Sequence, residues 1–117
     1  MLNRVILVGR LTKDPVLKIL PSGAKQAEVT IVHNRRYRQG EEWKEEVNFF
    51  DVVAYGKLAD KIVNGANRGE LVIVEGRLRQ ERWQTEEGEN SSRIRVVCEH
   101  FRVIQQKKEQ EYQEMEE

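Results

Sequence analysis

The sequence has few of the residues on which most covalent and catalytic chemistry depends. Its 117 residues include one cysteine, two histidines and two prolines. The single thiol, Cys98, excludes an intrachain disulfide, which is typical of a protein from a reducing cytoplasm. Two histidines and one cysteine are also too few for a convincing zinc site unless the fold adds carboxylates. We therefore predict no metal and no cofactor.

Long apolar runs and nucleotide-binding loops are missing as well. The early run from Val5 to Val8 is far shorter than a signal-peptide core or the ~20 residues that span a bilayer. No G-x-G-x-x-G or G-x-x-x-x-G-K-[ST] loop occurs. Cys98 and His100 share one strand parity, but the sequence implies no third group to orient them, and a cysteine in an apolar strand is usually inert. We predict a cytoplasmic protein that is not an enzyme.

Net charge is zero, because 20 basic residues balance 20 acidic ones. The distribution along the chain is uneven. Residues 1–104 carry 18 Lys and Arg against 15 Asp and Glu, whereas residues 105–117 carry 2 against 5. A mildly basic body with an acidic tail is compatible with a polyanionic partner. The length fits one domain, so we predict a folded domain over 1–104 and a polar, acidic, disordered tail over 105–117.

Strand patterns dominate the folded part. Five segments are rich in β-branched residues or alternate apolar with polar residues, and the predicted strands are Asn3–Leu11, Lys25–Tyr37, Trp43–Tyr55, Glu70–Trp83 and Arg93–Ile104. Between the third and fourth strands, apolar residues at helical spacing predict a short helix that Asn64-Gly65 could cap. This order predicts a mainly β, five-stranded OB-fold Greek-key barrel.

Turn signals refine this prediction. The polar Gln39–Glu42 link joins two long strands, which predicts a protruding hairpin, and residues 85–92 are predicted to form a loop. Gly9 and Gly76 each interrupt an apolar strand, where a bulge or sharp bend would help so few strands to close. By alternation, Leu78 should point toward the core, and the opposite face should carry Arg77, Arg79 and Trp83.

Aromatic and cationic side chains interleave on three of the predicted strands. Tyr37 lies among Arg35, Arg36 and Arg38; Phe49 and Tyr55 precede Lys57; Trp83 follows Arg77, Arg79 and Arg82. One such cluster alone is usually core or solvated surface. Three on neighbouring strands favour single-stranded nucleic acid, because a ring can stack on any unpaired base for ~1–3 kcal/mol. Cations neutralise the backbone regardless of sequence.

Three stretches in this order and spacing, NRVILVGRLTKDP, FFDVVAYGKLAD and VEGRLRQERW, resemble the bacterial single-stranded DNA-binding protein family over residues 1–104. The resemblance implies an OB-fold that binds single-stranded DNA in replication, recombination and repair, in the nucleoid of the cytoplasm. It also implies a homotetramer, built from dimers that pair their first strands through Asn3 to Val8.

The resemblance assigns roles to individual residues. The positions on which DNA bases stack in the family correspond to Tyr37, Phe49, Tyr55 and Trp83, and the phosphate-contacting positions to Arg4, Lys57, Arg79 and Arg82. Two of the stacking positions, here Tyr37 and Phe49, are commonly tryptophan in relatives. Asp51 is a second departure, since relatives often have a basic residue there.

Relatives continue into a long tail whose acidic tip, ending in proline-phenylalanine, recruits replication and repair proteins. This chain stops at Glu117 without that tip, so we expect a shortened chain, with such partners only if a longer tail exists. Two alternatives stay open. One is a dimeric primosome-type replication-restart protein of the same fold, which sedimentation would distinguish. The other is an OB module that binds protein, which would leave tryptophan fluorescence unquenched by oligo-dT.

Overall fold

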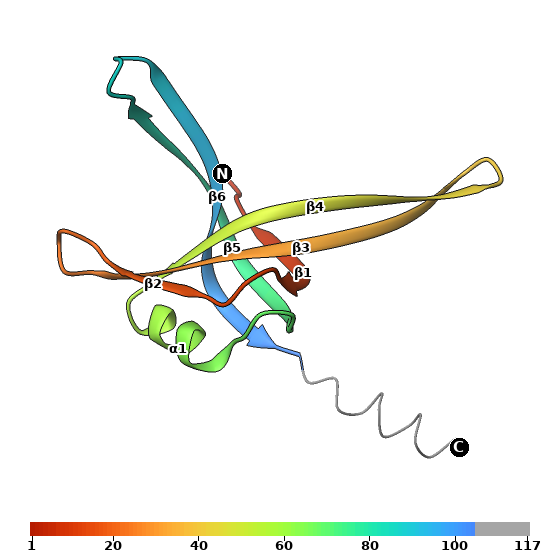
Figure 1. Cartoon of the computed structure of the whole chain (residues 1–117), viewed down its shortest axis with the longest axis horizontal. Coiled ribbons are helices and arrows are strands. Elements are labelled where there is room, and N and C mark those ends of the chain that lie inside the picture. Colours follow the sequence, from red (N-terminus) through yellow and green to blue (C-terminus); the bar gives the residue numbers. More distant parts are fainter. Residues whose placement is uncertain (105–117) are drawn as a thin grey trace.

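The computed structural model describes residues 1–104, in which five strands close a barrel (Figure 1). The elements are β1 (Val5–Leu11), β2 (Val16–Ile19), β3 (Lys25–Gln39), β4 (Glu42–Tyr55), α1 (Lys57–Gly65), β5 (Leu71–Gln84) and β6 (Asn90–Val103). The strand order β1-β5-β6-β4-β3 closes through a β1–β3 pairing, and β4 with β6 is the one parallel pair in this part of the chain. The predicted OB-fold is confirmed.

The short strand β2 was not predicted. It pairs antiparallel with β3 alone, and all four of its residues are exposed. A strand with no buried face has no reason to alternate apolar and polar residues, so its pattern carries no period of two. It lies at the edge of the sheet and takes no part in closing the barrel. The five predicted strands therefore correspond to β1, β3, β4, β5 and β6.

The core lies inside the barrel and under α1. Ile31 on β3, Val52 on β4, and Val72 and Val74 at the apolar start of β5 all belong to it, and each is at most 1% exposed. α1 packs against β3, β4 and β6 and buries Ile62. The helix begins and ends close to its predicted bounds. Its C-cap, however, is the extended residue after Gly65 (φ −127°) and not a left-handed glycine.

Gly9 and Gly76 both stand where another strand approaches the backbone closely. A Cβ on Gly9 would lie 2.5 Å from the carbonyl oxygen of Val32, and one on Gly76 would overlap the carbonyl oxygen of Val97. The β5–β6 pairing also shifts register between Glu75 and Gly76. The predicted irregularity is confirmed at Gly76, whereas the β1–β5 register continues without a shift through Gly9. What the two glycines share is the close approach of another strand.

Two hairpins extend beyond the barrel, and only the β3–β4 hairpin was predicted to protrude (Figure 1). The β3–β4 hairpin turns at Gly40, as expected. The β5–β6 hairpin is longer than predicted, because its turn covers only residues 85–89 and Asn90–Ser92 already pair with β5. The predicted core position of Leu78 is therefore wrong. Its side chain is 45% exposed, since β5 has left the barrel at that point.

In residues 1–104 no helix is both long and apolar enough to cross a membrane. The tail predicted over 105–117 lies outside the described residues.

Candidate nucleic-acid interface

Tyr55 and Arg79 form the centre of the candidate surface. Arg79 Nη2 donates a hydrogen bond of 2.7 Å to the Tyr55 hydroxyl, and its Cζ lies 5.5 Å from the centre of the ring. The amide of the buried Gln26 donates a second hydrogen bond, of 3.2 Å, to the same hydroxyl. The ring of Tyr55 is half-buried and held at its edge. A base could therefore stack on it without the ring having to be ordered first.

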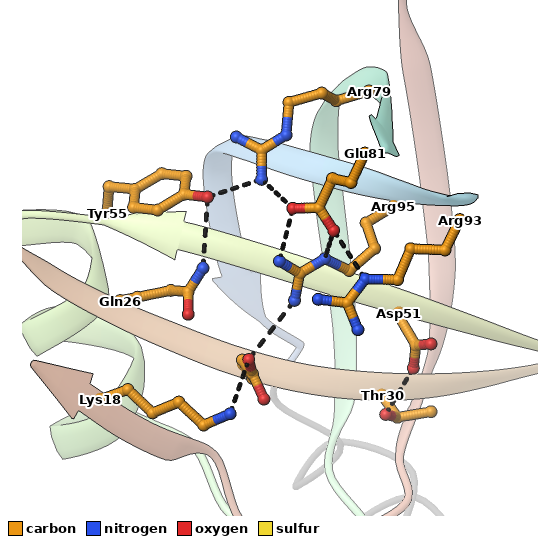
Figure 2. A network of polar contacts seen from close by, with 10 residues as sticks. Lys18, Gln26, Thr30, Asp51, Tyr55, Arg79, Glu81, Arg93 and Arg95 are labelled. Atoms are coloured by element: carbon orange, nitrogen blue, oxygen red, sulfur yellow. Dashed lines mark hydrogen bonds and ion pairs between the residues drawn. The ribbon is translucent and has the colours of Figure 1, made fainter. Parts of the chain in front are cut away.

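Glu81 binds three arginines at once (Figure 2). Its Oε1 accepts from Arg93 Nε at 2.7 Å and from Arg95 Nε at 2.6 Å. Its Oε2 accepts from Arg79 Nη2 at 2.6 Å and from Arg95 Nη2 at 2.7 Å. Hydrogen bonds from Arg95, and then from Arg93 and Arg79, lower the pKa of Glu81 to about 2. The carboxylate is consequently ionised at any physiological pH.

Arg95 is the buried member of this cluster, with its side chain 6% exposed. Besides Glu81 it reaches Glu28 at 3.4 Å, and Glu28 in turn accepts from Lys18 at 3.1 Å. Burial alone would raise the pKa of Glu28, but the hydrogen bond from Lys18 and the charge of Arg95 lower it overall. A buried guanidinium cannot lose its proton, so the negative charges of Glu28 and Glu81 compensate the positive charge of Arg95.

Trp83 presents a second ring near the end of β5. It pairs with Ser91 across the hairpin and is 45% exposed, and Arg93 Cζ lies 5.6 Å from the ring centre. A hollow of ≈ 500 Å³ beside it is lined by Arg82, Trp83, Gln84, Asn90, Ser91 and Ser92. The predicted phosphate contact Arg82 donates to Gln80 Oε1 at 2.8 Å. Ring, arginine and polar rim together suit an unpaired base and its phosphate.

Phe49 lies on the same face of β4 as Tyr55, and so does a residue that was not predicted, Trp43. Phe49 is 66% exposed and Trp43 is 63% exposed. Arg36 Cζ lies 5.5 Å from the centre of the Trp43 ring. Trp43, Phe49 and Tyr55 follow each other at intervals of six residues, so strand alternation alone puts them on one face. That signal was present in the sequence.

The predicted cluster around Tyr37 is divided between the two faces of the β3–β4 hairpin. Tyr37 pairs with Lys44, on the face opposite Phe49. Arg35 stays with it, its Cζ 5.7 Å from the ring centre. Arg36 and Arg38 lie on the other face with Trp43, and Arg38 Nε donates to the Gly40 carbonyl at 3.0 Å.

The remaining predicted cations lie apart from the Glu81 cluster. Arg4 forms an ion pair with Glu75 on β5. Lys57 begins α1 and Arg77 lies on β5; both are exposed, and neither has an ion pair within residues 1–104. Asp51, noted as a departure, accepts from Thr30 Oγ1 at 2.9 Å. None of these contacts removes the side chains from solvent.

Sequence reasoning missed Glu81, Arg93 and Arg95. The sequence shows that Glu81 shares the strand parity of Arg79 and Trp83, and that Arg93 and Arg95 share one parity on the next strand. The ion pairs between the two strands depend on the register of β5 against β6. Cys98, considered above as a nucleophile, is buried, and its thiol donates a hydrogen bond of 3.2 Å to the His100 carbonyl oxygen. Burial raises its pKa to about 11, so the thiolate is scarce at neutral pH. Residues 1–104 contain no group of three or more ligating side chains that could hold a metal.

Comparison with known proteins agrees with this geometry. The chain is 48% identical along its whole length to a single-stranded DNA-binding protein of Aquifex aeolicus, of which it spans 80%. It is 39% identical to the single-stranded DNA-binding protein of Treponema pallidum over 87% of its own length, but spans only 57% of that relative.

Among solved structures, a Plasmodium falciparum SSB complex with single-stranded DNA superimposes with a TM-score of 0.81. The match covers 90% of this chain and 97% of that one at 24% identity, which supports the fold. A sequence model of the Single-strand binding protein family matches residues 2–104, nearly everything that the structure describes. By sequence and by fold, this chain belongs to the single-strand binding protein family.

Proposed function

We propose that this protein binds single-stranded DNA without regard to its sequence and protects it during replication, recombination and repair. The observation that carries the proposal is the pairing of partly exposed rings with arginines on one surface. Tyr55 lies beside Arg79, and Trp83 lies beside Arg93. Membership of the single-strand binding protein family supports the same conclusion.

The chemistry of this surface selects unpaired strands. A ring can stack only on a base whose face is free, and a duplex hides those faces between neighbouring pairs. Guanidinium groups bind phosphate through charge-assisted hydrogen bonds that are the same for every nucleotide. The proposed stacking residues are Tyr55 and Trp83 with Phe49 and Trp43, and also Tyr37, which lies on the opposite face of the β3–β4 hairpin. Phosphate contacts are Arg4, Arg35, Arg36, Arg38, Lys57, Arg77, Arg79 and Arg82, with Arg93.

The proposal includes a homotetramer made from dimers that pair their first strands through Asn3 to Val8. β1 pairs with β5 from Val5 to Arg10 but meets β3 only at Arg10 and Leu11, so most of its other edge has no strand neighbour within residues 1–104. Ile6 and Val8 are 63% and 43% exposed along it. An unpaired apolar edge is a template for a second copy. Recruitment of replication and repair proteins is proposed only for a chain with a longer tail.

Two measurements test the proposal. Titration with oligo-dT and with duplex of equal length, at two salt concentrations, should show tight binding of the single strand only. Its affinity should fall with salt by a log–log slope of about −0.7 per phosphate neutralised. Equal affinity for the duplex would contradict the proposal. In sedimentation, a tetramer of four 13.8 kDa chains is expected, and a dimer would favour the replication-restart alternative.

A further inference from the structure

The carboxylate of Glu81 links one candidate stacking ring to another. Arg79 bridges this carboxylate to the Tyr55 ring, and Arg93 bridges it to the Trp83 ring. Oε2 accepts from Arg79 at 2.6 Å, and Oε1 accepts from Arg93 at 2.7 Å. One acidic side chain therefore holds an arginine beside each of two rings.

An acidic group at the centre of a surface for a polyanion needs an explanation, because its charge repels phosphate. The hydrogen bonds of Glu81 nevertheless engage only some of the donors of Arg79 and Arg93. Arg93 donates to Glu81 through Nε alone, and its two terminal nitrogens have no hydrogen-bond partner within residues 1–104. Its side chain is 52% exposed. Arg79 uses only Nη2, which leaves Nη1 without a partner in the same part of the chain. Glu81 thus orients both arginines and leaves each of them N–H groups that can bind phosphate.

The carboxylate itself is held firmly. Arg95, at 6% exposure, binds both of its oxygens, and Glu28 restrains Arg95 from the other side at 3.4 Å. The cluster of four basic side chains (Lys18, Arg79, Arg93, Arg95) and two acidic ones (Glu28, Glu81) has a net charge of 4 − 2 = +2. It therefore still attracts phosphate, despite the carboxylate at its centre.

We propose that Glu81 is a positioning residue for single-stranded DNA: it fixes Arg79 and Arg93 so that their free N–H groups meet the phosphates next to bases stacked on Tyr55 and Trp83. This inference rests on the proposed function. A free arginine side chain loses rotamer entropy when it is ordered on a phosphate. Ordering it before binding lowers the cost of association.

The test compares two changes at Glu81 with a matched change nearby. E81D keeps the charge but withdraws the carboxylate by one methylene, and E81Q keeps the length but removes the charge. E87Q removes the same charge from an exposed residue of the β5–β6 turn. If Glu81 positions the arginines, E81D and E81Q should each bind oligo-dT about tenfold more weakly, as expected for lost hydrogen bonds to a charged group. E87Q should bind as tightly as the parent or slightly more tightly.

Salt dependence separates positioning from a merely structural role. Loss of two phosphate contacts should reduce the magnitude of the log–log slope by up to about 1.4 in E81D, since each contact contributes about 0.7. An E81D variant that is folded by circular dichroism and keeps the parent's affinity and slope would overturn the inference. So would tighter binding by E81Q, which would make Glu81 a competitor of phosphate.

A second variant covers the case in which the changes at Glu81 do not fold. Arg93→Gln removes an exposed side chain, and it should weaken binding and reduce the magnitude of the slope by about 0.7. Unchanged binding by R93Q would equally overturn the inference. Failure of the proposed function is distinguishable, because the parent protein itself would then fail to bind oligo-dT.

Discussion

Tyr55 on β4 and Arg79 on β5 are joined by a hydrogen bond of 2.7 Å, although their strands are not neighbours in the sheet. β6 lies between them and contributes the buried Arg95 beneath the contact. Three strands thus meet in one polar cluster at the place where the barrel passes into the β5–β6 hairpin. The cluster orients the ring of Tyr55 and the guanidinium of Arg79 together.

Substitutions at Tyr55 separate the contribution of the ring from that of the hydroxyl. Y55A should weaken oligo-dT binding by about 1–3 kcal/mol, the increment for one stacked base. Y55F keeps the ring and should lose little affinity. It should lower the free energy of unfolding by about 1 kcal/mol, because Gln26 and Arg79 lose their acceptor. Fluorescence titration and urea denaturation measure the two effects. Equal affinity of Y55A and Y55F would exclude Tyr55 as a stacking residue.

Trp83 and Trp43 are the two tryptophans of the chain, so each can be observed alone. In a W43F background, oligo-dT should quench the remaining Trp83 emission. W83A should weaken binding by about 1–3 kcal/mol. W83F is the matched control, since it keeps a ring and should lose less affinity. A Trp83 signal that stays constant while oligo-dT binds would remove this residue from the interface.

The sequence predicts those parts of the fold that depend on local pattern. Val72 and Val74 belong to an apolar run, and Gly76 interrupts it, so both the buried strand and its irregularity could be inferred. β2 could not, since its residues bury no face and keep no period. Leu78 was placed in the core because alternation was extended past the point where β5 leaves the barrel.

The candidate site was harder to predict than the strands. Single residues such as Tyr55 and Trp83 could be selected by type, parity and family resemblance. The Glu81 cluster could not, because Glu81 and Arg95 are 14 residues apart and meet only through the β5–β6 register. That register follows from a turn of five residues, 85–89, whereas the sequence predicted a longer loop over 85–92. Side-chain networks between strands thus depend on turn length as much as on composition.

Gly76 offers a test of the close approach between β5 and β6. G76A should lower the free energy of unfolding by about 1–3 kcal/mol or more, because its methyl group would overlap the backbone carbonyl of Val97. Gly65, at the end of α1, is the control: a Cβ there meets nothing within 4 Å, and G65A should be neutral or slightly stabilising. Urea denaturation measures both. A G76A protein as stable as the parent would show that the strands can separate without cost.

The low pKa of Glu81 predicts how stability depends on pH. Its pKa is about 2 in the folded protein and ordinarily 4.5. The folded state therefore binds fewer protons, and this stabilisation is complete above about pH 4.5 and lost as the pH falls through 2. At neutral pH it amounts to at most about 3 kcal/mol. We expect E81Q to be less stable than the parent at pH 7. The two unfolding free energies should converge as the pH falls toward 2, where about half of the folded molecules carry a protonated Glu81.

The control for this experiment is E87Q, whose difference from the parent should stay small throughout this range, since Glu87 has no ion pair within residues 1–104. Denaturation in urea at pH 7, 4 and 2.5 supplies the three points needed. A constant difference between E81Q and the parent would mean that Glu81 stabilises the fold through its shape or its hydrogen bonds alone. Convergence would instead identify its charge, held between Arg79, Arg93 and Arg95, as the source of the stability.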